Sequence, residues 1–107
     1  MGRFSYDSRA DSVYIDDRIL AHLRLAVMNK LRRAELFMFD VELRGDSGWR
    51  SFWVHPAVPL QFHFCGSRQP YINRSWVEAL IRAASGPHGL SIVPEPEESA
   101  QDGPATT

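Results

Sequence analysis

The sequence predicts an α+β domain in which an antiparallel-rich sheet of about five to six strands carries two helices on one face. Two patterns lead to this fold class. Several short segments alternate apolar and polar residues, as half-buried strands do, whereas two longer segments place apolar residues three and four positions apart, as amphipathic helices do. Turn-forming residues separate these segments in the order strand, strand, helix, three strands, helix, strand.

The length of 107 residues suffices for one domain with its own core. We expect that domain over residues 1–94 and a disordered acidic, proline-rich tail over 95–107, where four carboxylates occur without a basic residue. The single Cys65 has no partner for a disulfide within the chain, and the N-terminus lacks an apolar leader. The sequence therefore predicts a cytoplasmic protein that makes no membrane contact.

The charge is nearly balanced, with 12 basic and 13 acidic residues. Because four of the acids lie in the tail, nine acids remain against 12 basic residues in the body, an excess of three positive charges. This excess is too small to require a nucleic-acid partner.

The first part of the chain predicts a hairpin followed by a helix. Residues 4–6 and 13–15 form the two strands, with DSRA as their turn. From 17 to 33 the apolar residues recur at helical spacing, and Asp16 or Asp17 can cap the helix. The outer side of this helix is expected to carry its basic residues, which are Arg18, Arg24, Lys30, Arg32 and Arg33.

The middle of the chain predicts a hairpin of half-buried strands. Alternation in ELFMFDVELR places Phe39 and Val41 on the apolar side, and the turn residues GDSG follow. We expect Val41 to lie opposite Phe52 and Phe39 opposite Val54.

The segment SFWVHPAVPLQFHF at 51–64 predicts strand, turn and strand, because its two prolines cannot remain in a central ladder. Matching the apolar sides turns the other side chains outward. These are Trp53, His55, Gln61 and His63. In a hairpin of this register the two histidines are separated by about 13 Å, so one metal ion cannot reach both. We expect no metal site and no cofactor.

The last part predicts a second helix and a short strand. Asn73 can cap a helix whose inner stripe begins at Trp76 or Val77, and Gly86 stands where a left-handed end is expected. Ser75 with Glu78 offers an alternative capping box. A strand over 90–93 follows.

No arrangement of residues supports catalysis, and we expect a protein that is not an enzyme. Neither helix is preceded by a glycine-rich phosphate loop, and Cys65 beside His63 lacks an orienting group. Asp40 and His55 could form a carboxylate–imidazole pair on neighbouring strands, but such pairs more often orient a strand than catalyse.

Trp53 indicates a binding surface. A large aromatic among polar side chains is the composition of an interaction hot spot. The surface would comprise Trp53 with Asp40, His55, Gln61 and His63, and would serve a second copy of the chain or a protein partner. The alternatives are that the opening hairpin or the tail covers the indole, or that it contacts a small ligand or nucleic acid.

A nucleic-acid accessory module is the alternative function. It would use the basic residues of the first helix, namely Arg24, Lys30, Arg32 and Arg33.

Five segments together resemble a family of small proteins of unknown function from actinobacteria and their phages. They are IDDRILAHL at 15–23, KLRRAE at 30–35, SFWVHPAVPLQF at 51–62, NRSWVEAL at 73–80 and GLSIVPEP at 89–96. The resemblance covers about residues 1–96. Members commonly carry a transferred label, ATP-dependent DNA ligase, which comes with no established mechanism.

The sequence does not support DNA ligase activity for this chain. A ligase needs a Lys-x-Asp-Gly nucleophile motif, whereas Lys30 is followed by LRR, and 107 residues cannot hold a nucleotidyltransferase domain. The resemblance leaves open an accessory role in DNA ligation, repair or phage DNA metabolism. Members of the family tend to have glycine where Ala34 stands, so we expect the first helix to end here without a left-handed residue.

Overall fold

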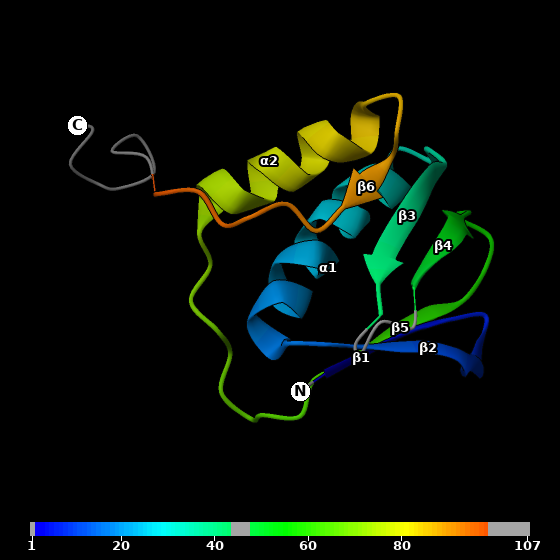
Figure 1. Cartoon of the computed structure of the whole chain (residues 1–107), viewed down its shortest axis with the longest axis horizontal. Coiled ribbons are helices and arrows are strands. Elements are labelled where there is room, and N and C mark those ends of the chain that lie inside the picture. The colour runs from blue at the N-terminus through cyan, green and yellow to red at the C-terminus, as the bar shows by residue number, and fades with distance from the viewer. Residues whose placement is uncertain (1, 44–47, 99–107) are drawn as a thin grey trace.

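The computed structural model describes residues 2–43 and 48–98 (Figure 1). Six strands and two helices follow in the predicted order, which confirms the α+β class. The elements are β1 (Gly2–Tyr6), β2 (Ser8–Ile15), α1 (Asp17–Arg32), β3 (Phe37–Glu42), β4 (Trp49–Val54), β5 (Leu60–His63), α2 (Arg74–Ser85) and β6 (Leu90–Ser91). Within these ranges, neither helix combines the length and apolar character needed to cross a bilayer.

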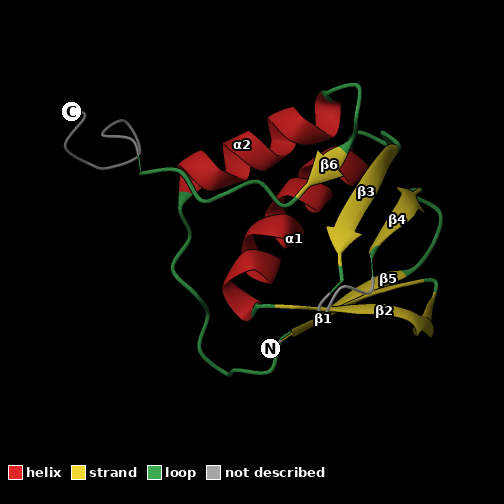
Figure 2. Ribbon diagram, in the orientation of Figure 1, coloured by secondary structure: helices red, strands yellow, loops and turns green. Residues whose placement is uncertain are grey.

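The strands form two three-stranded sheets, where the sequence predicted one larger sheet. One sheet has the order β2-β1-β5 and is antiparallel throughout. The other has the order β4-β3-β6, with an antiparallel β3–β4 pair and a parallel β3–β6 pair. Figure 2 shows the two helices side by side; α2 contacts β3 and β6, and α1 contacts β1.

The expected hairpin between residues 51–54 and 60–64 is wrong, and the proline-bracketed loop explains the difference. A turn closed by the Val58 N–H and the His55 carbonyl, 3.1 Å apart, leads the chain away from β4. The Pro59 carbonyl then accepts a hydrogen bond of 2.8 Å from the Asp7 N–H, next to the β1–β5 ladder. The loop therefore carries the chain from one sheet to the other.

The predicted register of the β3–β4 hairpin is wrong by two residues, but the predicted faces are correct. Phe39 pairs with Phe52, and Phe37 pairs with Val54. Glu42 pairs with Trp49, so the connection is longer than the expected four-residue turn. A shift of two leaves every side chain on its own face, because strands repeat with a period of two.

Phe4 holds the two sheets together. Its ring lies 5.3 Å from that of Phe39 and 5.4 Å from that of Phe52, both in edge-to-face geometry. On its own sheet it packs against Phe62 at 5.4 Å. Because Phe4 is 1% exposed and touches aromatic rings of both sheets, the core continues from one sheet to the other, and it also includes apolar residues of both helices.

The first helix begins as predicted but ends differently. Asp16 is the N-cap, and its carboxylate accepts a hydrogen bond from the Arg18 N–H. At the other end Ala34 adopts a φ of 57°, the left-handed conformation that we did not expect. The Ala34 N–H donates to Leu31 and the Glu35 N–H donates to Lys30, which together form a Schellman motif.

We expect Ala34→Gly to raise the free energy of unfolding by about 0.5–1 kcal/mol, because glycine adopts a left-handed φ without the steric penalty of a Cβ. Urea denaturation of both proteins measures the difference. The control is Ala79→Gly in the interior of α2, which should lower stability by about 1 kcal/mol. Equal losses in the two variants would contradict the left-handed assignment.

The second helix has its predicted cap. The Asn73 side chain accepts from the N–H groups of Ser75 and Trp76, and Trp76 begins the buried stripe. The expected left-handed stop at Gly86 is wrong, because its φ is −82°. The left-handed residue is Gly89, with a φ of 81°, and it turns the chain into β6.

Lys30 does not lie on the outer side of α1 as predicted. It is 7% exposed, and its ammonium group binds the hydroxyl of Ser85 at 3.0 Å and the carboxylate of Glu35 at 2.8 Å. The reason is helical spacing, since position 30 follows Leu23 and Val27 on the inner stripe.

The first residues of the predicted tail have contacts with the domain. The Arg18 guanidinium forms an ion pair with the Glu95 carboxylate, and the Asn73 amide donates to the Pro96 carbonyl at 2.9 Å. The Tyr71 hydroxyl donates to the Glu98 carboxylate. Residues up to 98 therefore contact the domain, and the remaining predicted tail, 99–107, lies outside the described residues.

Candidate binding surface

The outer face of the β3–β4 hairpin is turned away from the core. Residues at odd positions of β3 are buried, and so are Phe52 and Val54 of β4, so the alternate side chains point outward. We call this surface the tryptophan face. It consists of Met38, Asp40 and Glu42 on β3 and Trp49, Ser51 and Trp53 on β4.

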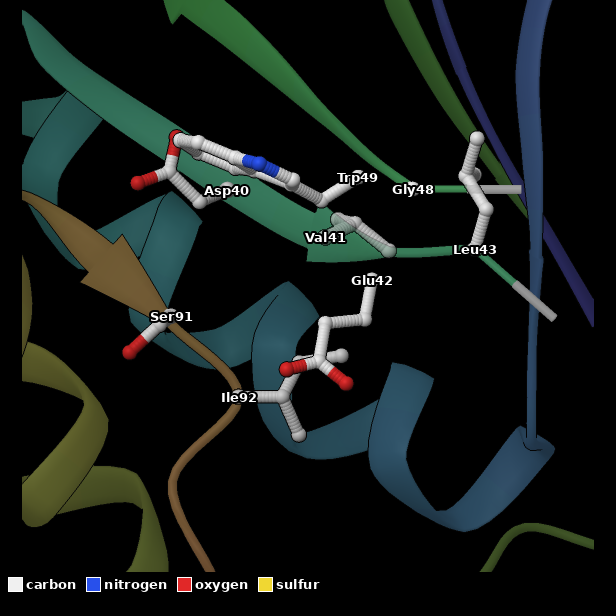
Figure 3. Close-up of a pocket in the computed structure, with 8 residues that line it drawn as sticks. All are labelled: Asp40, Val41, Glu42, Leu43, Gly48, Trp49, Ser91 and Ile92. Carbon is white, nitrogen blue, oxygen red and sulfur yellow. The ribbon is translucent and has the colours of Figure 1, made fainter. Parts of the chain in front are cut away.

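Two indoles dominate the tryptophan face. Trp49 is 64% exposed and Trp53 is 55% exposed, although both belong to regular strand. Beside Trp49 lies an open pocket of about 870 Å³ that also includes Asp40, Glu42 and Ser91. Figure 3 shows the indole and the two carboxylates around this pocket. The surface thus offers aromatic area next to negative charge.

The opening hairpin touches the edge of β4 without covering the indole of Trp53. The Tyr6 hydroxyl donates to the Trp53 carbonyl at 2.7 Å and accepts from the His55 N–H at 3.0 Å. The hydroxyl therefore satisfies one carbonyl and one N–H group that a neighbouring strand would otherwise bind. Since Trp53 remains more than half exposed, neither the opening hairpin nor residues 95–98 supplies the cover considered above.

The structure divides the five residues predicted to form one surface. Asp40 and Trp53 lie on the tryptophan face, and His55 follows directly after β4. Gln61 and His63 lie on β5, which pairs with β1 in the other sheet. All except the half-buried Asp40 are exposed. The single surface predicted from the sequence depended on the incorrect pairing between residues 51–54 and 60–64.

Trp49 belongs to the surface but was missed in the sequence analysis. The alternation that turned Trp53 outward applies equally to Trp49, which is four residues earlier on the same strand. The signal was therefore present.

The side chains suited to acid–base chemistry have local partners. Asp40 accepts a hydrogen bond from the Ser51 hydroxyl, and Nδ1 of His55 accepts one from the Ala57 N–H at 3.0 Å. Among the described residues, no group of three or more His, Cys, Asp and Glu side chains is arranged to hold a metal ion.

The predicted nucleic-acid residues are exposed except for one. Arg24, Arg32 and Arg33 have exposed side chains on or next to α1, whereas the Lys30 ammonium is engaged inside the fold. Arg24 and Arg32 line two adjoining depressions beside α1.

Comparison with protein families matches residues 1–95 to a domain of unknown function (DUF7882). The chain belongs to this family. Searches of curated proteins and of solved structures found no match. The match agrees with the expected resemblance to a family without assigned function, and it spans the whole tryptophan face.

In this DUF7882 chain a buried histidine links the starts of the two helices. His22 of α1 is 0% exposed, and its Nε2 lies 2.8 Å from the Asn73 N–H. Since an amide N–H only donates, Nε2 accepts, and Nδ1–H donates to the Arg18 carbonyl at 2.7 Å. The imidazole is therefore neutral with a fixed tautomer. The Trp76 ring packs against it, with the two ring centres 4.4 Å apart.

Arg18, whose carbonyl binds this histidine, also binds residues 71 and 95 through its side chain. Its guanidinium donates to both oxygens of Glu95 and to the Tyr71 carbonyl, and it lies 5.9 Å from the centre of the Trp76 ring. These contacts lower the pKa of Glu95, chiefly through the hydrogen bond from Arg18. The roles of His22 and Arg18 were not predictable from the sequence, because the partners that join them to the second helix and its approach are about 50 or more residues away along the chain.

We expect the DUF7882 domain to lose stability as the pH falls from 7 towards 5. Burial lowers the pKa of His22, although its bond to the Arg18 carbonyl and the charge of Glu95 act in the opposite direction. Below the unfolded pKa of about 6.5 the unfolded chain binds a proton that the folded chain excludes, so protonation favours unfolding.

The variant His22→Gln tests this pH dependence. A glutamine amide can donate and accept but does not titrate near neutral pH, so the change in stability between pH 7 and 5 should become smaller. Urea titrations at several pH values measure it. If the variant and the parent lost stability in parallel over this range, His22 would not be the responsible group.

Proposed function

We propose that this chain is a non-enzymatic binding or assembly module whose contact surface is the tryptophan face. The observation that carries the proposal is the exposure of two tryptophans on one strand, 64% for Trp49 and 55% for Trp53. Isolated exposed apolar residues are ordinary, but large aromatics gathered on one flat face are typical of interaction surfaces. Tryptophan is also among the residues that contribute most to binding energy.

The position of the face at a sheet edge supports the same function. β4 is an edge strand that pairs with β3 on one side only. On its free side, the described hydrogen bonds include those of the Tyr6 hydroxyl with the backbone of Trp53 and His55. An edge strand with available backbone groups can add contacts to a partner. Asp40 and His55 are hydrogen-bonded to Ser51 and to the Ala57 N–H, which favours a role in recognition over one in catalysis.

The combined change Trp49→Ala and Trp53→Ala tests the proposal. Both indoles are mainly solvent-exposed, so the variant should fold with nearly unchanged stability. Binding to a second copy or to a protein partner should weaken at least thirtyfold, the effect of losing about 2 kcal/mol at a hot spot. Sedimentation velocity measures self-association, and parallel pull-downs with parent and variant measure other partners.

The matched control is Tyr14→Ala. Tyr14 is an aromatic residue on a strand of the other sheet and is 66% exposed, so its loss removes exposed aromatic area from another surface. Binding should survive this change. If the double tryptophan variant and the parent behaved alike in both assays, the proposed function would be wrong.

The exposed arginines of α1 favour a second candidate, a nucleic-acid accessory module. Arg24, Arg32 and Arg33 are exposed on the same helix and its end. Neutralising phosphates with these groups would give an affinity that falls steeply with salt. A gel-shift titration at about 50 mM and 200 mM salt tests this candidate, which absence of a shift at the lower concentration would remove.

A further inference from the structure

A second surface beside α1 combines positive charge with an apolar floor. Two adjoining pockets, with volumes of about 450 Å³ and 530 Å³, share the walls made by Leu25 and Ile72. We call them together the arginine groove. Its rim carries Arg24 and Arg68 at one pocket, and Arg32 and Arg74 at the other.

The charge of the arginine groove is largely uncompensated. All four arginines are exposed, and the ion pairs found among the described residues involve Arg18 and Lys30 instead. Glu78 is the one acidic residue that lines either pocket. The groove therefore attracts a partner that presents carboxylates together with apolar side chains.

The tryptophan face has the complementary composition. It presents Asp40 and Glu42, and its described side chains include no basic residue. The indoles of Trp49 and Trp53 supply the apolar part. Arginine stacks on aromatic rings and pairs with carboxylates, and both arginine and tryptophan are enriched in protein interfaces.

The dimensions of the two surfaces also agree. Trp49 and Trp53 are four residues apart on one strand, so their Cα atoms are separated by about 13 Å. The α1 residues of the groove extend from Ala21 to Arg32. At the rise of a helix this is about 16 Å, long enough to receive both indoles.

We infer that the tryptophan face of one copy docks on the arginine groove of a second copy. This inference rests on the proposed function and names the partner of the same surface. The two surfaces belong to different elements, and each is directed away from the core, so one copy can use both at once. Such a contact is heterologous and joins copies head to tail into a ring or an open chain.

Two variants, each altered on one surface, test the inference. Glu42→Lys reverses charge on the tryptophan face, whereas Arg24→Glu with Arg68→Glu reverses charge on the groove; all three residues are exposed. Each variant alone should associate at least tenfold more weakly than the parent in sedimentation equilibrium. Mixed together, they should form a 1:1 dimer, because each retains the surface that the other has lost.

The controls separate this contact from general electrostatics. Arg82→Glu changes an exposed arginine that lines neither pocket, and it should leave the association within about twofold of the parent. The parent association should weaken between about 50 mM and 300 mM salt, since the contact includes exposed charge pairs.

Other outcomes overturn the inference in distinguishable ways. Full self-association by the groove variant would indicate that two tryptophan faces meet each other. A monomeric parent that still loses a pull-down partner when both tryptophans are changed would reject the second copy and leave the proposed function intact. A parent that shows neither self-association nor a tryptophan-dependent partner would reject both. Nucleic-acid binding by the groove without self-association would assign the arginines to the alternative function.

Discussion

Phe4→Ala is expected to lower the free energy of unfolding by about 4 kcal/mol, the usual loss for removing a buried phenyl ring. Phe4 is 1% exposed and is the residue whose ring contacts Phe39 and Phe52 on one sheet and Phe62 on the other. Its removal would leave a cavity where the two sheets meet. Because a domain of this size is stable by roughly 5–15 kcal/mol, the variant should remain measurable in urea titrations.

Phe4→Leu is the matched control, since it keeps most of the apolar volume and loses only the edge-to-face contacts. We expect it to lower stability by about 1–1.5 kcal/mol. If Phe4→Ala lowered stability by less than about 1 kcal/mol, the two sheets would not share this core.

Gly89→Ala is expected to lower the free energy of unfolding by about 3 kcal/mol, because two effects combine. The φ of 81° is unfavourable for a residue with a Cβ. That Cβ would also lie 2.5 Å from the Met38 carbonyl oxygen, so β6 would have to move away from β3. Met38 pairs with Trp53, and the movement would therefore reach the tryptophan face.

Gly48→Ala separates the two effects. Gly48 has a φ of 86°, but an added Cβ would meet no atom within 4 Å. The variant should lose only the conformational part, about 1 kcal/mol. Urea titration of both variants gives the comparison, and equal losses would contradict the close approach of Gly89 to β3.

The face of the strand on which each side chain lies was the part of the fold that the sequence could predict most reliably. Alternation placed Phe39, Val41 and Phe52 inside and Trp53 outside, and this arrangement is observed. The predicted faces were correct despite an error of two residues in register, because only a shift by an odd number of residues exchanges the faces of a strand. The helix starts at Asp16 and Asn73 were also predictable, since a cap depends on adjacent residues.

The division into two sheets could not be read from local pattern. The strand over 60–63 carries the same alternation whether it pairs with β4 or with β1, and the selection depends on how the Pro56–Pro59 loop directs the chain. The candidate site was affected directly. Gln61 and His63 were assigned to the surface of Trp53, whereas Trp49, which does belong to it, was omitted.

Side-chain engagement over long sequence separations was equally hidden. Helical spacing places Lys30 on the inner stripe of α1, and there its ammonium group binds Ser85, 55 residues later, and Glu35. Glu95, at the start of the predicted tail, forms an ion pair with Arg18, 77 residues earlier. In both cases composition suggested a charge without a protein partner, whereas the structure shows a tertiary contact.

In the proposed function, the indoles of the tryptophan face are open in the single chain and become covered on binding. Acrylamide quenching of tryptophan fluorescence in Trp76→Phe measures this accessibility, since Trp49 and Trp53 are then the tryptophans that remain. We expect strong quenching in dilute solution and protection at concentrations where the sedimenting mass increases or a partner is bound. Indoles that were shielded at every dilution, or that stayed fully accessible in the complex, would contradict this expectation.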